Sequence, residues 1–261
     1  MMQTDQILQM LRSVAAEVIT PRFRNLSDDQ IFEKKPGDYV TVADRESEVE
    51  ITKALRVAYP DALIVGEEAT FKDPSLPDGL LEADHAFTID PIDGTGNYVR
   101  GSDKHAVMLA ELKNGQLSRS WIWLPMFRKA YVAERGNGVF LNGQRLSPIE
   151  RTGVALGGTS RKNLQGYDAE GKLEPTTTTN NCAGVDYADL LEGSIDYFLY
   201  TSPKPWDHLP GQLMLQEIGG EILKMDGSPY DASGDASIIF SGSNVERLQQ
   251  IIDAWKPNLD K

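Results

Sequence analysis

Residues 90–95 read DPIDGT and directly follow the apolar run 86–89, AFTI, which is typical of a buried strand. The proline presets the backbone for a bend and the glycine allows close approach, so we expect a sharp turn here. The two aspartates, three residues apart on that turn, would converge on one point and repel each other. A divalent cation removes this repulsion, and Mg²⁺ prefers hard oxygen ligands. The segment therefore predicts a metal site where the chain leaves a strand.

The same turn also suits a phosphate group. A helix that began after Asp93 would direct free backbone N–H groups, and the positive end of its dipole, toward the same space. Metal and phosphate would then share one loop. Taken alone, residues 90–95 are equally compatible with a plain structural turn.

Two further acidic residues stand at the ends of predicted elements. Glu67 follows the apolar run 62–65 and a glycine, and Asp207, in the sequence Trp-Asp-His, begins a predicted helix. An aspartate at the start of a helix is usually an N-cap, and a Glu-Glu pair after a strand usually lies in a solvated loop. Neither residue alone identifies a site.

The composition narrows the class of protein. The chain has 261 residues, 40% of them hydrophobic, and a formal net charge of −13. An acidic surface repels nucleic acid and anionic membranes, so we expect neither as a partner. No apolar run reaches the roughly 18 residues that a transmembrane helix needs. The single cysteine, Cys182, excludes an intramolecular disulfide and favours a reducing compartment, the cytoplasm.

The apolar patterns divide the chain into two halves. Residues 1–146 predict an N-terminal helix, a second helix from about Asp44 to before Pro60, and an antiparallel meander over 105–146, where Asn-Gly and Gly-Asn-Gly sequences mark hairpins. Residues 147–261 alternate helices and strands, which is typical of an α/β arrangement. No flexible linker separates the halves, so we expect them to pack as one unit.

Three motifs in a fixed order resemble the inositol monophosphatase family of metal-dependent phosphatases. They are GEE at 66–68, DPIDGT at 90–95 and KPWDHLPG at 204–211. The resemblance covers nearly the whole chain and includes TVAD at 41–44, GVFLNG at 138–143 and EIGG at 217–220. It implies a mixed α+β and α/β fold, a layered αβαβα sandwich of the inositol monophosphatase and fructose-1,6-bisphosphatase type. It also implies a phosphoric monoester hydrolase that depends on Mg²⁺, is inhibited by lithium and often forms a homodimer.

The resemblance further implies a ligand set for about two to three Mg²⁺ ions per site. The first ion would be held by Glu67, Asp90 and the main-chain carbonyl of Ile92. The second would be held by Asp90, Asp93 and Asp207, and Glu67 would help to hold a weaker third.

It also implies how the phosphate and the water would be bound. Gly94 and Thr95 would bind the phosphate through backbone N–H groups, beside Asp93. The Thr95 hydroxyl, supported by Asp44, would orient the attacking water together with Glu67. Direct attack by water needs no phospho-enzyme.

One position departs from the family pattern. Many members carry a glutamate that contacts sugar hydroxyls seven residues before the Trp-Asp aspartate, whereas this chain has Tyr200. We expect Tyr200 at the rim of the metal site, where its ring would contact the alcohol of the substrate and weaken any preference for inositol. Nearer the N-terminus, Lys34-Lys35 is either a solvated charge pair or part of a loop that the resemblance places over the site.

The sequence leaves the identity of the substrate open within the class of small phosphorylated metabolites. Inositol 1-phosphate, histidinol phosphate and a sugar phosphate are candidates, and 3′-phosphoadenosine 5′-phosphate would make the protein a 3′(2′),5′-bisphosphate nucleotidase. A different class is a regulatory binding protein that retains the fold without turnover. Mg²⁺-dependent release of phosphate separates the enzyme from the binding protein.

Overall fold

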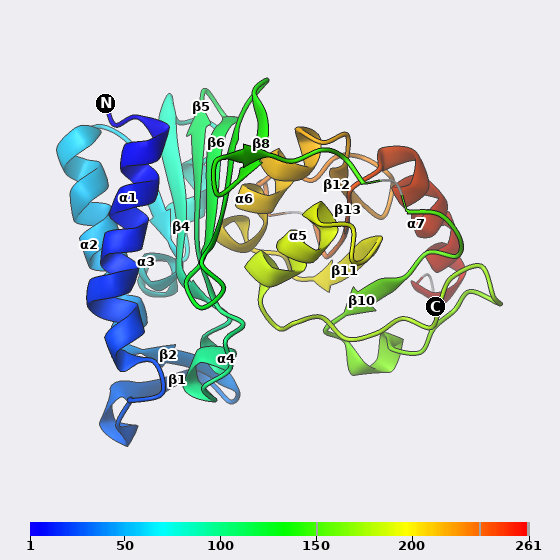
Figure 1. The fold of residues 1–261 in the computed structure, drawn as a ribbon, viewed down its shortest axis with the longest axis horizontal. Helices are drawn as coiled ribbons and strands as arrows, with labels where there is room; N and C mark the ends of the chain where they lie inside the picture. Colours follow the sequence, from blue (N-terminus) through cyan, green and yellow to red (C-terminus); the bar gives the residue numbers. More distant parts are fainter. Residues whose placement is uncertain (150, 235, 260–261) are drawn as a thin grey trace.

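The computed structural model describes residues 1–149, 151–234 and 236–259, which form five layers (Figure 1). Two helices cover the outer face of a seven-stranded sheet, two more lie between it and a four-stranded sheet, and one covers the far face of the four-stranded sheet. In that order the helices are α1 (Thr4–Val14), α2 (Val42–Ala58), α5 (Ala183–Leu191), α6 (Pro205–Gln216) and α7 (Val245–Leu259). The expected αβαβα sandwich is confirmed.

The seven-stranded sheet keeps its strands in chain order from β3 to β9. β3 and β4 run parallel, and the later pairs are antiparallel, as expected for the meander. The register between β4 and β5 is interrupted between Asp90 and Asp93, so the chain bulges out of the sheet at the expected turn. The strands are β3 (Leu63–Gly66), β4 (His85–Asp93), β5 (Ala106–Lys113), β6 (Gln116–Leu124), β7 (Lys129–Glu134), β8 (Gly138–Leu141) and β9 (Gln144–Arg145).

The four-stranded sheet has the order β10-β11-β13-β12, with β10 parallel to β11 and the other pairs antiparallel. α6 contacts β5 and β6 on one side and β12 on the other. Gly211 allows α6 to approach α5, because a Cβ there would stand 2.3 Å from the Tyr187 ring. The strands are β10 (Gly157–Thr159), β11 (Tyr197–Thr201), β12 (Glu221–Lys224) and β13 (Ile238–Gly242).

A hairpin and two short helices complete the part of the fold that carries the site. β1 (Ile31–Lys35) and β2 (Asp38–Thr41) pair antiparallel, and β2 leads directly into α2. α3 (Glu67–Lys72) begins where β3 ends, and α4 (Thr95–Val99) begins just after β4. The hairpin and α3 were not expected, because the sequence predicted loops in both places.

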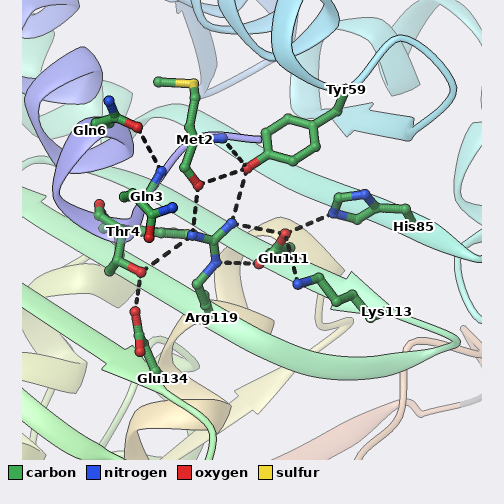
Figure 2. A network of polar contacts seen from close by, with 11 residues as sticks. Met2, Gln3, Thr4, Gln6, Tyr59, His85, Glu111, Lys113, Arg119 and Glu134 are labelled. Atoms are coloured by element: carbon green, nitrogen blue, oxygen red, sulfur yellow. Dashed lines mark hydrogen bonds and ion pairs between the residues drawn. The ribbon is translucent and has the colours of Figure 1, made fainter.

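The N-terminal residues are fastened to the outer face of the seven-stranded sheet (Figure 2). Arg119 on β6 forms an ion pair with the fully buried Glu111 on β5, and its Nη1 donates to the Met2 carbonyl at 3.1 Å. The hydroxyl of Tyr59, at the end of α2, lies 3.0 Å from both the Met2 nitrogen and the Met2 carbonyl. His85 completes the network at 2.7 Å from Glu111. These bonds hold the beginning of α1 against the sheet.

The two halves expected from the sequence share apolar contacts. One buried cluster includes Ile122 and Ala133 from the seven-stranded sheet and Leu213 from α6. The division into residues 1–146 and 147–261 stays a prediction. None of the helices within the described residues combines the length and apolar character needed to cross a membrane.

Candidate active site

A cleft of about 970 Å³ lies where three elements meet. Its lining includes the four carboxylates singled out in the sequence: Glu67 in the first turn of α3, Asp90 and Asp93 at the end of β4, and Asp207 in the first turn of α6. The backbone of residues 92–95 lines the same cleft. The fold therefore gathers acidic residues that lie far apart in the chain.

The position of Glu67 depends on a carboxylate that sequence reasoning missed. Glu48 of α2 accepts hydrogen bonds from the backbone N–H groups of Glu68 at 2.7 Å and Ala69 at 2.8 Å, and so caps the beginning of α3. A Cβ at Gly66 would stand 2.3 Å from Glu48 Cδ, so only glycine leaves room for this cap. Burial raises the pKa of Glu48 to about 7, although the two N–H bonds oppose the rise. The glycine before the Glu-Glu pair was the feature of the sequence that could have indicated this cap.

Asp93 is fixed by the beginning of α5. Its Oδ2 accepts from the Gly184 N–H at 2.6 Å and from the Cys182 thiol at 3.0 Å. Gly94 turns the chain with φ +81°, and a Cβ there would stand 3.0 Å from both Cys182 Cβ and the Lys104 carbonyl. Cys182 is buried, and its thiol orients a carboxylate of the cleft. The geometry of the turn thus needs both this glycine and a small side chain at the N-cap of α5.

Thr95 and Asp44 meet as the family resemblance implied. Thr95 Oγ1 lies 2.9 Å from Asp44 Oδ1 and 2.9 Å from the Ile92 carbonyl. Asp44 Oδ2 in turn accepts from the Thr41 N–H at 2.8 Å and the Thr41 hydroxyl at 2.5 Å. Burial raises the pKa of Asp44 to about 7, although the bonds from Thr41 oppose the rise. The Thr95 hydroxyl is therefore held between two acceptors at the edge of the cleft.

The four carboxylates of the cleft have raised pKa values. Burial is the largest cause for each, because a carboxylate loses hydration on leaving water. The pKa values of Asp90 and Asp207 lie well above the usual range, and repulsion from Glu67 and Asp93 adds to the effect of burial. The pKa values of Glu67 and Asp93 are also raised. Such a cluster needs a cation to become fully ionised.

The donor atoms fit Mg²⁺. They are carboxylate oxygens together with the carbonyl of Ile92, and Mg²⁺ is bound by oxygen. As the side chains stand, no three His, Cys, Asp or Glu residues in the described part of the chain converge tightly enough to hold a metal ion. To hold a metal ion, the carboxylates of the cleft would have to move closer together.

Lys34 supplies a positive charge in direct contact with this cluster. Its Nζ lies 2.8 Å from Glu67 Oε1 and 2.5 Å from Glu68 Oε1. Burial acts to lower the pKa of Lys34, but the two glutamates outweigh this and the pKa rises above its usual value. Lys34-Lys35 was interpreted either as a solvated charge pair or as part of a loop over the site. For Lys34, the structure favours the position over the site.

Tyr200 does not join the other predicted site residues. It lies on β11 near its end, as expected, but it is buried and does not line the cleft. Its hydroxyl donates to Asp186 Oδ2 at 3.0 Å, and its ring centroid lies 4.7 Å from that of His208. Strand alternation turns Tyr200 with Phe198 toward the layer of α5 and α6, where Asp186 accepts its hydrogen bond. The expected position at the rim is corrected accordingly.

Comparison with known sequences places the chain among phosphatases. A sequence model described as the inositol monophosphatase family matches residues 2–255. The relative named Nus factor SuhB, from Pseudomonas aeruginosa, is 34% identical over 227 residues that cover 82% of each chain. The fructose-1,6-bisphosphatase/inositol-1-monophosphatase of Thermotoga maritima is 29% identical over 229 residues, 85% of this chain and 86% of that protein.

Solved structures agree with this fold. An IMPase of Thermotoga maritima superimposes with a TM-score of 0.83 at 25% identity, covering 98% of this chain and 97% of that one. An IMPase/NADP phosphatase complexed with Mg²⁺ and phosphate has a TM-score of 0.75 at 21% identity, covering 94% and 91%, and supports the fold alone. Because the family match spans residues 2–255, this chain belongs to the inositol monophosphatase family.

Proposed function

We propose that this chain is a Mg²⁺-dependent phosphatase that hydrolyses small phosphate monoesters, with the metal held by Glu67, Asp90, Asp93 and Asp207. The observation that carries the proposal is the gathering of these four carboxylates, from three elements, in one cleft. Their raised pKa values mean that the cluster costs stability when ionised, which a purely structural role does not require. Relatives named inositol-1-monophosphatase support the same activity.

Each group of the site has a role in attack by water. Bound Mg²⁺ supplies a water molecule of lowered pKa. Thr95 donates its hydroxyl hydrogen to Asp44 and presents its lone pairs to that water, which fixes the direction of attack. Asp44, with a pKa near 7, can take up a proton around neutral pH. Glu67, at the beginning of α3, would help to orient that water.

The phosphate of the substrate would lie at the beginning of α4. Gly94 turns the chain there, and the first backbone N–H groups of a helix have no intrahelical partner. Gly94 and Thr95 would donate these N–H groups to the phosphate oxygens, beside Asp93. About two to three Mg²⁺ ions would balance the charge of this arrangement.

Part of the wall of the cleft is apolar and would accommodate a ring of the substrate. Phe71 of α3 and Pro74 just after it line one side, and Pro203 and Trp206 line the cleft around the beginning of α6. Tyr200 uses its hydroxyl internally and offers no hydrogen bond to a polyol. We therefore expect ring-bearing or sparsely hydroxylated esters, such as histidinol phosphate or a 3′-phosphonucleotide, to be better substrates than inositol 1-phosphate.

The relatives named Nus factor SuhB favour a second candidate, a regulatory binding role on the same fold. Homodimer assembly, inhibition by lithium and a cytoplasmic location belong to the main proposal and rest on the family resemblance.

The test is phosphate release from a panel of monoesters with Mg²⁺ and with excess chelator. The proposal expects turnover with Mg²⁺, none in chelator, and inhibition by Ca²⁺, whose looser coordination suits an octahedral Mg²⁺ site poorly. Metal binding without turnover on the whole panel would favour the binding role. Full activity in excess chelator would exclude the proposed metal chemistry.

A further inference from the structure

One short helix carries both a carboxylate of the cleft and an exposed aromatic ring. Glu67 is the first residue of α3 and Phe71 is the fifth, and both line the cleft. Residues four apart lie on the same face of a helix, about 6 Å apart along its axis. Pro74, just after α3, lines the cleft as well. α3 therefore presents a carboxylate and, one turn further on, an apolar surface to the same space.

The ring of Phe71 is not used in the core. It is 58% exposed and belongs to none of the buried apolar clusters of the described residues. Its ring centre lies 5.6 Å from the ammonium group of Lys34. Trp206 also lines the cleft, but it is only 7% exposed and packs in the cluster that contains Leu213 of α6. Of these two rings, Phe71 is therefore the one with free surface for a ligand.

Phe71 is also not an isolated apolar residue. Pro77, in the 3₁₀ helix η4 (Leu76–Gly79), and Leu81, just after it, line the same cleft. Both are half-buried, whereas Phe71 and Pro74 are exposed. Single exposed apolar side chains are common, but four that line one cavity form an apolar wall. A ring that covered this wall would remove apolar surface from water on both sides of the contact.

The position of this apolar wall decides which part of a substrate it meets. The proposed function places the phosphate at Gly94 and Thr95, with Glu67 beside it, so the alcohol of the ester can extend along α3 toward Phe71. Aromatic rings prefer offset-stacked or edge-to-face contact with one another. We propose that Phe71 is a specificity-determining residue that packs against a planar ring of the substrate, so that the preferred esters carry an aromatic or heteroaromatic ring on a short linker. This inference rests on the proposed function and adds the residue that selects the alcohol.

Two esters that differ only in the ring test the role of Phe71. 2-Phenylethyl phosphate and ethyl phosphate have similar leaving groups, so the ratio of their kcat/KM values reports the contribution of the ring. The wild type should favour the phenyl ester. Phe71→Ala should lower the ratio about three- to tenfold, mainly through KM, because the ring is held alike in the ground state and the transition state. A displaced α3 would slow both esters alike and leave the ratio unchanged.

The matched control is Phe127→Ala. Phe127 is 44% exposed, lies between β6 and β7 and is not part of the lining of the cleft. Its removal should leave the ratio within about 1.5-fold of the wild type, as expected for an exposed side chain away from the site. Phe71→Tyr retains the flat ring and should keep most of the ratio. A wild-type ratio in Phe71→Ala, or an equal loss in Phe127→Ala, overturns the proposal.

Phosphonates separate this inference from the proposed function. 3-Phenylpropylphosphonate and propylphosphonate replace the ester oxygen of the two substrates by carbon and are not hydrolysed. Their binding is measured by isothermal titration calorimetry in MgCl₂. Phe71→Ala should weaken the phenyl compound about three- to tenfold relative to the propyl compound. Ring-dependent binding without turnover of either ester would remove the phosphatase and keep the ring site. Mg²⁺-dependent turnover with equal ratios in wild type and Phe71→Ala would do the reverse.

Discussion

The Thr95 hydroxyl is placed by two acceptors of different kinds. Asp44 is a carboxylate and Ile92 offers a main-chain carbonyl, each 2.9 Å from Thr95 Oγ1. The carboxylate is the stronger acceptor, since hydrogen bonds to charged groups are shorter and stronger. The hydroxyl oxygen then keeps its lone pairs for a water molecule in the cleft. We therefore expect Thr95 to act on the water rather than on the bound ester.

Thr95→Ala should lower kcat by about 10²–10⁴-fold, the usual contribution of a positioned acid–base group, and leave KM within about threefold. Thr95→Ser is the matched control, because it keeps the hydroxyl and should retain most of the activity. Steady-state kinetics on the best substrate of the panel gives both constants. A change confined to KM would show that Thr95 binds substrate and does not orient water.

Tyr200 is a residue whose side-chain contacts could not be predicted from the sequence. Its place on a strand followed from the apolar pattern, but its hydrogen bond to Asp186, which lies on α5, 14 residues away in the chain, left no local pattern. Asp186 is itself buried, and burial raises its pKa to about 7. Tyr200→Glu would therefore put a second carboxylate beside Asp186 and destabilise the fold. It would not create a sugar-binding group in the cleft.

At the scale of elements, α3 depends on a glycine at its N-cap. The sequence predicted β3 and β4 from their apolar runs, yet apart from the glycine before the Glu-Glu pair it gave no sign that Glu48 of α2 caps α3. Caps formed between distant segments leave no local pattern. The hairpin β1–β2 was missed for a related reason, since its strands are short, β1 is largely exposed and neither strand shows apolar alternation.

Gly66→Ala should destabilise the protein by about 1–3 kcal/mol, because the new Cβ would stand 2.3 Å from Glu48 Cδ and displace the cap. Displacement of α3 should also weaken Mn²⁺ binding through Glu67. Gly79→Ala is a suitable control, since its Cβ would make ordinary contact with Leu63 Cδ2 at 3.6 Å. Urea denaturation and a Mn²⁺ titration measure the two effects. Equal stability of the two variants would contradict the described packing.

At the scale of the whole molecule, buried carboxylates set the pH dependence of stability. Asp44, Glu48 and Asp186 have pKa values raised to about 7, whereas the unfolded chain titrates near the model-peptide values of about 4. Between about pH 4 and 7 the folded state therefore binds more protons than the unfolded state. Stability falls as pH rises through this window.

In chelator, the Tm should therefore fall by about 5 °C or more between pH 5 and pH 8. Added Mg²⁺ should raise the Tm most at pH 8, where the carboxylates of the cleft are ionised in greatest number. Circular dichroism melts across the pH series give both results. A Tm that rises from pH 5 to pH 8 in chelator would mean that these carboxylates are better solvated than the structure indicates.

Many helices and strands were predictable from the periodicity of apolar residues, and the layers were predictable because the order of the motifs resembles that of a known family. The meander, α2 and the helices and strands after β11 follow from local pattern, and the order of the three motifs implied how they would converge. The side-chain contacts across the cleft could not be derived in the same way. The contact of Lys34 with α3 joins elements whose separation in space only the folded chain defines.

Asp90 carries the central claim, since it is expected to bridge two metal ions at the centre of the cluster. Asp90→Asn keeps the shape of the side chain and removes its charge. In samples of wild type and Asp90→Asn, bound Mn²⁺ is counted by electron paramagnetic resonance, and phosphate release is measured in the same tubes. The account predicts loss of at least one bound ion and a fall in turnover of about a thousandfold or more in Asp90→Asn, with a folded protein by circular dichroism. Wild-type turnover and wild-type Mn²⁺ stoichiometry in Asp90→Asn would contradict it.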